Sequence, residues 1–214
     1  MGKHKVISVR NLTASTFVVR FERLNFQFQT GQFVMLRIPG SLENREYSVY
    51  SGENDDYLEV LVREVEGGKV SGKLKKLKPG TEIDVNGPFG FFKFNPEKYT
   101  SKKFLFVATG TGISPFHSFA RTFPGLDYKL VHGVRLKEES YEHADYQKER
   151  VTLCLSGDEG GDFYGRVTDY LFTQKIDIET NCFLCGNSEM IYEVFDILTG
   201  KGIPVSNIYS EVYF

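Results

Sequence analysis

The sequence predicts two domains of different classes: an antiparallel β-barrel over residues 1–98, followed by an α/β domain with a parallel sheet over residues 99–214. In the first part, short β-branched and aromatic runs alternate at period two and are separated by glycine or proline. From residue 104, short apolar runs alternate with helical spacing, which is typical of a parallel sheet packed against helices. The length of 214 residues suffices for two domains of about 100 residues each.

The first domain should contain short strands around one short helix. Strands are expected over residues 6–8, 17–21, 33–38 and 57–65. A short helix is expected after a glycine pair, because Val70, Leu74 and Leu77 lie on one face at helical spacing. Residues 95–98, Asn-Pro-Glu-Lys, have the composition of a linker between the domains.

The second domain should alternate strands with helices. Strands are expected over residues 104–108, 128–132, 151–155, 182–184 and 207–212. Helices are expected over residues 114–122, around 141–147, and over 167–174 and 189–199, with Gly200 as the stop of the last one.

Composition excludes several classes of function. The net charge of −2 gives no support for general nucleic-acid binding. No run of 18 apolar residues predicts a membrane helix, and the first residues lack the apolar centre of a signal peptide, so we expect a cytoplasmic protein. We also expect a monomer. Three cysteines form no disulfide framework. Cys182 and Cys185 make a C-x-x-C, but residues three apart on a strand point to opposite faces, so no metal site is expected.

A glycine turn follows the buried strand over residues 104–108. Gly110, Thr111 and Gly112 lead into a helix that starts near Ser114 and Pro115. Glycine backbone and the N–H groups of a helix start can bind a diphosphate. The spacing G-x-G-x-x-P is neither a Walker loop nor the full G-x-G-x-x-G fingerprint, so by itself it fits an ordinary strand-to-helix turn equally well.

Two further segments carry candidate binding residues. Arg45 and Tyr47 share one face of an expected strand, where they can hold a phosphate and cover a planar ring, and Ser48 points to the other face. Residues 67–71, Gly-Gly-Lys-Val-Ser, form either a second anion site or a hairpin turn followed by an N-capping Ser71.

Together these motifs make the sequence resemble the ferredoxin/flavodoxin–NADP reductase family along nearly its whole length. The matching motifs occur in the family's order: Gly31-Gln32-Phe33, Arg45-x-Tyr47-Ser48, Gly68-Lys69-Val70-Ser71, Gly87-Pro88-Phe89-Gly90, Gly110-Thr111-Gly112-Ile113-Ser114-Pro115, Cys185-Gly186-Asn187 and Glu211-Val212-Tyr213-Phe214. The resemblance implies an FAD-binding barrel followed by a nicotinamide-dinucleotide domain.

The resemblance also implies roles for residues toward FAD. Arg45 and Ser71 would hold the FAD diphosphate with the backbone after Gly68, Tyr47 would stack on one face of the flavin ring, and Ser48 would hydrogen-bond near flavin N5. The full set of FAD contacts implied is Arg45, Tyr47, Ser48, Gly68, Lys69, Val70, Ser71, Tyr213 and Phe214.

The end of the chain has implied roles in turnover. Tyr213 would cover the opposite face of the flavin and move during turnover, and Phe214 would stack further along, on the adenine. Glu211 would be a polar or proton-relaying group near the reacting atoms. The residues implied to be catalytic are Ser48, Cys185, Glu211 and Tyr213.

For NADP(H), the resemblance implies contacts from residues Gly110, Thr111, Gly112, Pro115, Arg135, Arg166, Cys185, Gly186 and Asn187, with Cys185 beside the nicotinamide. Arg135 and Arg166 match positions that pair with the 2′-phosphate. Many relatives have Ser-Arg after the third strand, where this chain has Ser156, Gly157 and Asp158. We expect NADPH to be preferred, with NADH as the alternative.

The implied activity is hydride transfer between NADP(H) and FAD, with single electrons passing between the flavin and ferredoxin or flavodoxin. Five lysines within residues 69–78 are either a docking patch for such an acidic carrier or a solvated helix face: Lys69, Lys73, Lys75, Lys76 and Lys78. The alternatives are an NAD(P)H-dependent reductase component that feeds an oxygenase, a free flavin reductase, and a non-catalytic flavin-binding electron-transfer subunit.

Overall fold

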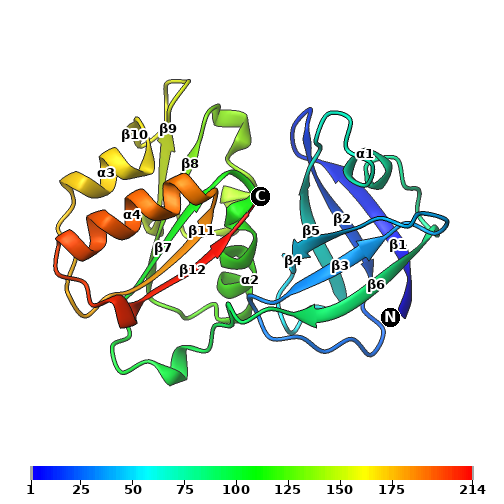
Figure 1. Cartoon of the computed structure of the whole chain (residues 1–214), viewed down its shortest axis with the longest axis horizontal. Helices are drawn as coiled ribbons and strands as arrows, with labels where there is room; N and C mark the ends of the chain where they lie inside the picture. The colour runs from blue at the N-terminus through cyan, green and yellow to red at the C-terminus, as the bar shows by residue number, and fades with distance from the viewer. Residues whose placement is uncertain (1, 214) are drawn as a thin grey trace. The chain divides into compact units, whose positions relative to one another are not determined.

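The computed structural model describes residues 2–213, which form two compact units (Figure 1). Unit 1 comprises Met1–Phe94 and Ser114–Pro124, and unit 2 comprises Asn95–Ile113 and Gly125–Phe214. The contacts therefore group residues 114–124 with the first part of the chain. The expected domain boundary after residue 98 stays a prediction.

Unit 1 is an antiparallel six-stranded sheet with the order β4-β3-β6-β1-β2-β5. Its strands are β1 (Gly2–Asn11), β2 (Thr16–Glu22), β3 (Phe33–Arg37), β4 (Asn44–Ser48), β5 (Tyr57–Arg63) and β6 (Glu82–Phe89). The sheet curls until Val49, after β4, makes an isolated antiparallel bridge with Val60 of β5. The predicted antiparallel class is confirmed, although the barrel is not closed by a continuous ladder.

The core of unit 1 comes from the period of two along its strands. Phe17, Val19 and Phe21 of β2 are buried against alternate residues of the neighbouring strand β5. Helix α1 (Ser71–Leu74) adds Leu74 to this core, and Val70, the residue before the helix, is part of the same core. The expected helical face is therefore confirmed, although the helix has only four residues.

Helix α2 (Ser114–Thr122) has the bounds that the sequence predicts. Its aromatic side chains are buried, and the ring of Phe119 stacks on Phe94 with centroids 4.6 Å apart. Phe116 contacts Phe92, which also lies in the segment after β6. These contacts lie within unit 1.

Unit 2 is a parallel six-stranded sheet with the order β10-β9-β8-β7-β11-β12. Its strands are β7 (Phe104–Thr109), β8 (Tyr128–Val134), β9 (Val151–Leu155), β10 (Phe163–Tyr164), β11 (Asn181–Gly186) and β12 (Ile208–Val212). Helices α3 (Val167–Thr173) and α4 (Ser188–Gly200) lie side by side (Figure 1), and Leu171 and Val194 pack on Val107 and Leu184. The predicted α/β class is confirmed.

The strand order fixes where a ligand can bind in unit 2. From the central β7 the chain proceeds outward to β8 and β9, then returns to the other side of β7 with β11. The order therefore reverses between β7 and β11. In open α/β sheets, ligands bind outside the carboxyl ends of the strands at this switch point.

The expected helix around residues 141–147 was wrong. One 3₁₀ helix, η4 (His143–Asp145), lies within this segment, and a second, η5 (Lys148–Arg150), follows it. Glu142 has a positive φ of 50°, and Tyr146 is extended, so the backbone cannot continue as one helix. Strands β6 and β10 were not predicted.

The remaining short helices are η1 (Pro96–Lys98), η2 (Gly110–Ile113), η3 (Lys137–Glu139) and η6 (Val205–Asn207). Asn95 caps η1 by accepting a hydrogen bond from the Glu97 N–H. The segment expected to be a linker is thus a capped 3₁₀ turn.

Candidate functional site

A glycine turn, the 3₁₀ helix η2, follows β7 at the switch point of unit 2. Gly110 has a φ of +54°, and a Cβ added there would meet no heavy atom within 4 Å. A Cβ on Gly112 would lie 2.3 Å from the carbonyl oxygen of Cys185. Position 110 therefore favours glycine because of its positive φ. Position 112 requires glycine because the turn packs directly on the end of β11.

The end of β11 makes the reciprocal contact with β7. Gly186 has a φ of +152°, and an added Cβ would lie 2.2 Å from Oγ1 of Thr109. Asn187 caps α4 by accepting from the Met190 N–H at 2.9 Å, and its Nδ2 donates to Thr109 Oγ1 at 3.4 Å. The structure thus brings the predicted Gly110–Gly112 and Cys185–Asn187 motifs together at one sheet edge, where α4 also begins.

Three candidate catalytic residues lie together in unit 2. Cys185 of β11 is in register with Glu211 of β12, and the Tyr213 N–H donates to the Gly186 carbonyl at 2.8 Å. Burial raises the pKa of the Cys185 thiol well above its ordinary value; the Glu211 carboxylate adds to this rise and a hydrogen bond from Tyr213 opposes it. Cys185 is therefore a thiol at neutral pH, and not a thiolate. Phe214 lies outside the described residues.

The other cysteines are also buried and reduced. Burial raises the pKa of Cys182 to about 12, and burial likewise raises that of Cys154 to about 12, before the smaller effects of Asp162 and Asp169. The Cys182 thiol donates to the Thr180 carbonyl.

The Arg45–Ser48 motif forms β4 in unit 1, with increasing burial along the strand. Arg45 is exposed and donates from Nη1 to the Asn44 carbonyl at 2.7 Å, Tyr47 is half-buried, and Ser48 is buried. Tyr47 packs on the core of unit 1, and burial raises its pKa to about 12, with Arg45 opposing the rise. Tyr47 is therefore a neutral aromatic ring beside an exposed cation.

Ser71 does not cap α1, so that alternative for the second glycine loop was wrong. Val70 holds the N-cap position and Ser71 is the first helical residue. The buried Ser71 Oγ instead accepts from the Val65 N–H at 3.1 Å, and a Cβ on Gly68 would lie 2.9 Å from this oxygen. A serine hydroxyl has one donor and two acceptor sites, so the Ser71 O–H can still donate to a ligand.

Three cations gather around Glu43 in unit 1. Lys69 Nζ lies 2.7 Å from Glu43 Oε1. The hydrogen bond from Lys69 lowers the pKa of Glu43, and the charges of Lys69, Arg45 and Lys73 add to this effect. A hollow of about 550 Å³ adjoins this cluster and is lined in part by Gly67, Gly68, Lys69 and Lys73. The structure therefore joins β4 and the second glycine loop in one cationic region.

The lysine segment, residues 69–78, is only partly engaged. Lys75 forms an ion pair with Glu64 and also donates to the Ala14 carbonyl. Within residues 2–213, Lys73, Lys76 and Lys78 form no ion pair. These three positive charges are available to a partner.

The two candidate 2′-phosphate arginines lie at the ends of different elements in unit 2. Arg135 follows β8, and a Cβ on Gly157 would lie 2.7 Å from its Cγ. Arg166 holds the N-cap position of α3, where its N–H donates to Asp169. Asp158 accepts from the Lys137 N–H at 3.2 Å, so this carboxylate is bound to backbone.

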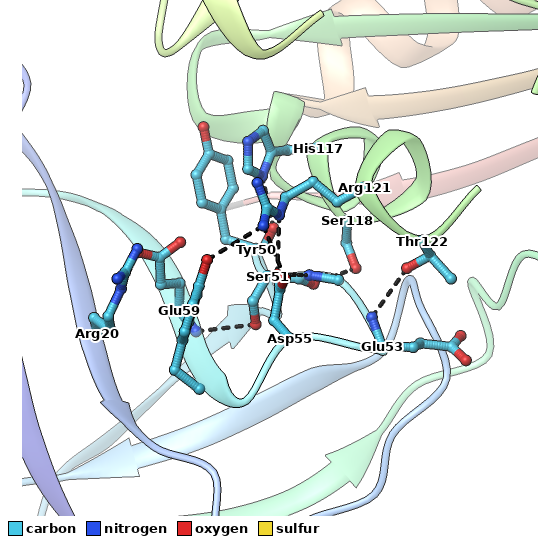
Figure 2. A network of polar contacts seen from close by, with 12 residues as sticks. Arg20, Tyr50, Ser51, Glu53, Asp55, Glu59, His117, Ser118, Arg121 and Thr122 are labelled. Carbon is cyan, nitrogen blue, oxygen red and sulfur yellow. Dashed lines mark hydrogen bonds and ion pairs between the residues drawn. The ribbon is translucent and has the colours of Figure 1, made fainter. Parts of the chain in front are cut away.

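A polar network along α2 was missed by the analysis of the sequence (Figure 2). The His117 ring stacks on Tyr50 at 3.8 Å, and its Nδ1–H donates to the Tyr50 carbonyl at 2.7 Å. Ser118 Oγ accepts from Thr30 Oγ1 at 2.6 Å and donates to the Ser51 carbonyl at 2.7 Å. The available signal was the position of His117 and Ser118 between Phe116 and Phe119 in the predicted helix.

The same network continues to the end of α2. Arg121 forms two hydrogen bonds with the Asp55 carboxylate, at 2.9 and 2.8 Å, and Thr122 Oγ1 accepts from the Glu53 N–H (Figure 2). The helix that follows the glycine turn is thus hydrogen-bonded to the loop between β4 and β5.

Comparisons with known proteins agree with both units. Residues 2–94 match the family model of the oxidoreductase FAD-binding domain. Ferredoxin–NADP reductase B from Sorangium cellulosum is 28% identical over 98% of this chain and 96% of its own length. The electron transfer subunit of a probable dihydroorotate dehydrogenase B (NAD(+)) from Pyrococcus abyssi is 30% identical over 87% of this chain and 70% of its own length.

Other relatives are longer. A glycine betaine monooxygenase reductase subunit from Chromohalobacter salexigens is 27% identical over 99% of this chain, which spans 64% of that protein. The Amycolatopsis cytochrome P450 reductase GcoB has a TM-score of 0.87 over 98% of this chain and 68% of its own, at 25% identity. Among residues 2–213, no helix has the length and apolar character required to cross a bilayer.

Proposed function

The chain belongs to the ferredoxin–NADP reductase family, and we propose that it is an FAD-dependent oxidoreductase that transfers hydride between NADP(H) and flavin. Single electrons then pass between the flavin and ferredoxin or flavodoxin. When bound, FAD supplies the ability to take two electrons as hydride and release them one at a time.

The observation that carries this proposal is the close backbone contact between the segments that follow β7 and end β11 in unit 2. Gly112 and Gly186 each allow a backbone approach that a Cβ would block. This approach brings the glycine turn and the first turn of α4 to the switch point, where their N–H groups can bind the phosphates of a dinucleotide. The side chain of Cys185 lies at the same edge, beside Tyr213.

The residues of unit 1 fit an FAD diphosphate. Arg45 is exposed, the Ser71 hydroxyl keeps its donor, and Lys69 lies with Arg45 around Glu43. Guanidinium and ammonium groups suit a diphosphate because charge-assisted hydrogen bonds are strong. Tyr47 would cover one face of the flavin, and Ser48 would hydrogen-bond near N5. The backbone of Gly68, Lys69 and Val70 would complete the FAD contacts.

In unit 2, Cys185 would lie beside the nicotinamide as a neutral thiol. A thiol that stays protonated is neither a nucleophile nor a redox partner under these conditions, so its role would be to shape the site. Glu211 would hold or move a proton near the reacting atoms. Tyr213 would cover the flavin face that the nicotinamide needs, so it would move during turnover.

Arg135 and Arg166 would bind the 2′-phosphate of NADP(H), which favours NADPH over NADH. Gly110, Thr111, Gly112, Pro115, Gly186 and Asn187 would surround the remaining dinucleotide. Asp158 accepts a hydrogen bond from the Lys137 N–H, and its negative charge opposes this preference. The NADPH preference, the monomeric state and the cytoplasmic location stay predictions.

A second candidate function is the reductase component of an oxygenase. The relative from Chromohalobacter salexigens favours it, since this chain matches 64% of that reductase subunit. In that case the electron acceptor would be another protein's metal centre, with the same flavin and dinucleotide chemistry in this chain. A free flavin reductase and a non-catalytic flavin-binding subunit are the remaining alternatives.

An absorbance spectrum followed by anaerobic addition of NADPH, then NADH, tests the proposal. We expect a stoichiometric, tightly held flavin whose yellow band bleaches with NADPH at lower concentrations than with NADH. Rapid exchange of the flavin would favour the free flavin reductase. A yellow protein that ignores both dinucleotides would favour the non-catalytic subunit, and a protein that cannot be loaded with FAD would contradict the assignment.

A further inference from the structure

A buried histidine contacts the glycine turn of unit 2, and a second, partly buried histidine contacts the first. His132 of β8 is fully buried, and its Nε2 lies 2.9 Å from the carbonyl oxygen of Gly110. Its Nδ1 lies 2.8 Å from Nε2 of His143, in η4. The two imidazoles and the turn therefore form one chain of hydrogen bonds within unit 2.

Only one neutral arrangement of protons satisfies both contacts. The Gly110 carbonyl can only accept, so His132 must carry its proton on Nε2. The Nδ1 of a neutral ring is then an acceptor, and His143 must donate to it from Nε2. The Gly110 carbonyl thus fixes the tautomer of His132, and His132 in turn fixes that of His143, while the hydrogen bond from His143 orients the His132 ring.

The surroundings keep both rings neutral. Burial lowers the pKa of His132 to about 3, with His143 lowering it further and the Gly110 carbonyl opposing. Burial also lowers the pKa of His143 to about 4, against a smaller effect of Asp162. The other titratable side chains facing the pair are Tyr141, beside His132, and Tyr146, beside His143.

The contact matters because the turn is built from glycines. Gly110 has a positive φ and open space where a Cβ would stand, so neither a side chain nor a neighbouring atom on that side restricts its backbone. Ordering such a backbone costs more conformational entropy than ordering other residues. Holding the carbonyl from one side orients this peptide before a ligand arrives.

We propose that His132, oriented by His143, is a positioning residue that fixes the Gly110 carbonyl and thereby presents the N–H groups of the glycine turn to the dinucleotide diphosphate. This role rests on the proposed function. It requires no chemistry at either histidine, since neither ring exchanges a proton during the reaction.

Binding of NADP⁺ to the FAD-loaded protein, followed by the flavin difference spectrum, tests this role. His132→Leu removes the donor, and we expect a dissociation constant about tenfold higher, the size expected for one lost hydrogen bond. His132→Gln can donate from its amide to the same carbonyl and should restore most of the affinity. Thermal unfolding and the flavin spectrum of each variant check that folding and FAD binding persist.

Two-bond ¹H–¹⁵N correlation spectra of the imidazoles provide a readout independent of the ligand. We expect the Nε2–H tautomer for both histidines at neutral pH, and a mixture of tautomers for His143 in His132→Leu, where the acceptor of its hydrogen bond is lost.

An unchanged dissociation constant in His132→Leu, or equal weakening in His132→Gln and His132→Leu, would overturn the positioning role while the proposed function stands. A wild-type protein that binds neither NADP⁺ nor NAD⁺ would overturn the proposed function, and this role with it. An Nδ1–H tautomer of His132 would overturn the hydrogen-bond chain whatever the affinities.

Discussion

At the scale of single residues, Glu43 decides how the cationic region of unit 1 behaves before a ligand binds. Its carboxylate accepts from Lys69 at 2.7 Å and interacts with Arg45 and Lys73. Two of these cations belong to the set proposed to bind the FAD diphosphate. A diphosphate entering this region would therefore compete with an internal anion for the same donors.

Replacing Glu43 with Gln should strengthen FAD binding. The substitution removes the competing charge while keeping the size of the side chain, so we expect the dissociation constant of FAD to fall about two- to tenfold at low salt, within the range of exposed ion pairs and charged hydrogen bonds. Titration of the flavin-free protein with FAD measures the effect. Glu66→Gln, on the loop that carries Lys69 but without an ion pair to these cations, is the matched control. A weaker affinity in Glu43→Gln would contradict this competition and would indicate that the carboxylate holds Lys69 in place.

At the scale of elements, α2 is the helix whose contacts the sequence revealed least. Its bounds follow from the glycine turn and from a proline in the first turn, and the structure reproduces them. The segment on which α2 packs cannot be inferred in this way, because Ser118 and His117 are hydrogen-bonded to backbone carbonyls after β4, far away in sequence. Helical periodicity predicts which residues are buried, and it carries no information about which loop they bind.

The network predicts different costs for two polar substitutions in α2. Ser118→Ala should lower the free energy of unfolding by about 1–3 kcal/mol, because it leaves the Thr30 hydroxyl and the Ser51 carbonyl buried without this partner. Arg121→Ala breaks a bidentate pair that is partly exposed, and should cost about 1 kcal/mol or less. Urea unfolding of both variants measures the difference. A larger loss in Arg121→Ala would show that the surface pair holds the helix.

The unpredicted strands have physical reasons of the same kind. In β6 only Ile83 and Val85 alternate as buried apolar residues, and Asp84 between them is paired with Arg37 of β3. A buried carboxylate that finds a cation from another strand is invisible to hydropathy. Strand β10 has two residues, Phe163 and Tyr164, and exists only through its pairing with β9. Strand β6 therefore depends on partner strands that are distant in the sequence, and β10 is too short to show a pattern of its own.

At the scale of the whole molecule, the chain combines two sheets with different sources of predictability. The class of each unit could be predicted from periodicity. Both the period of two along strands and the alternation of strands with helices can be read without knowing any contact. Candidate motifs were found because glycines have sharp backbone requirements, as at Gly112 and Gly186. The hydrogen-bonded histidines and the cations around Glu43 were not found, because each requires side chains from separate loops to meet.

Docking of an electron-transfer partner involves the surface of the whole molecule, and substitutions in the lysine segment, residues 69–78, test it. Lys73, Lys76 and Lys78 form no ion pair within residues 2–213, whereas Lys75 is bound to Glu64. Neutralising the three to Gln should slow reduction of an acidic ferredoxin about tenfold at low salt, because charge complementarity raises the association rate. The effect should vanish at high salt, where charges are screened.

Reduction of a small neutral dye by NADPH should stay unchanged in this triple variant, since the dye does not depend on docking. Lys75→Gln is the matched control, because its charge is already compensated, and it should leave ferredoxin reduction close to wild type. Stopped-flow measurements at several salt concentrations separate the two assays. Equal loss with ferredoxin and dye would place the three lysines in flavin or dinucleotide binding, and equal rates in all variants would mean that the segment is a solvated helix face and that an acidic carrier docks elsewhere.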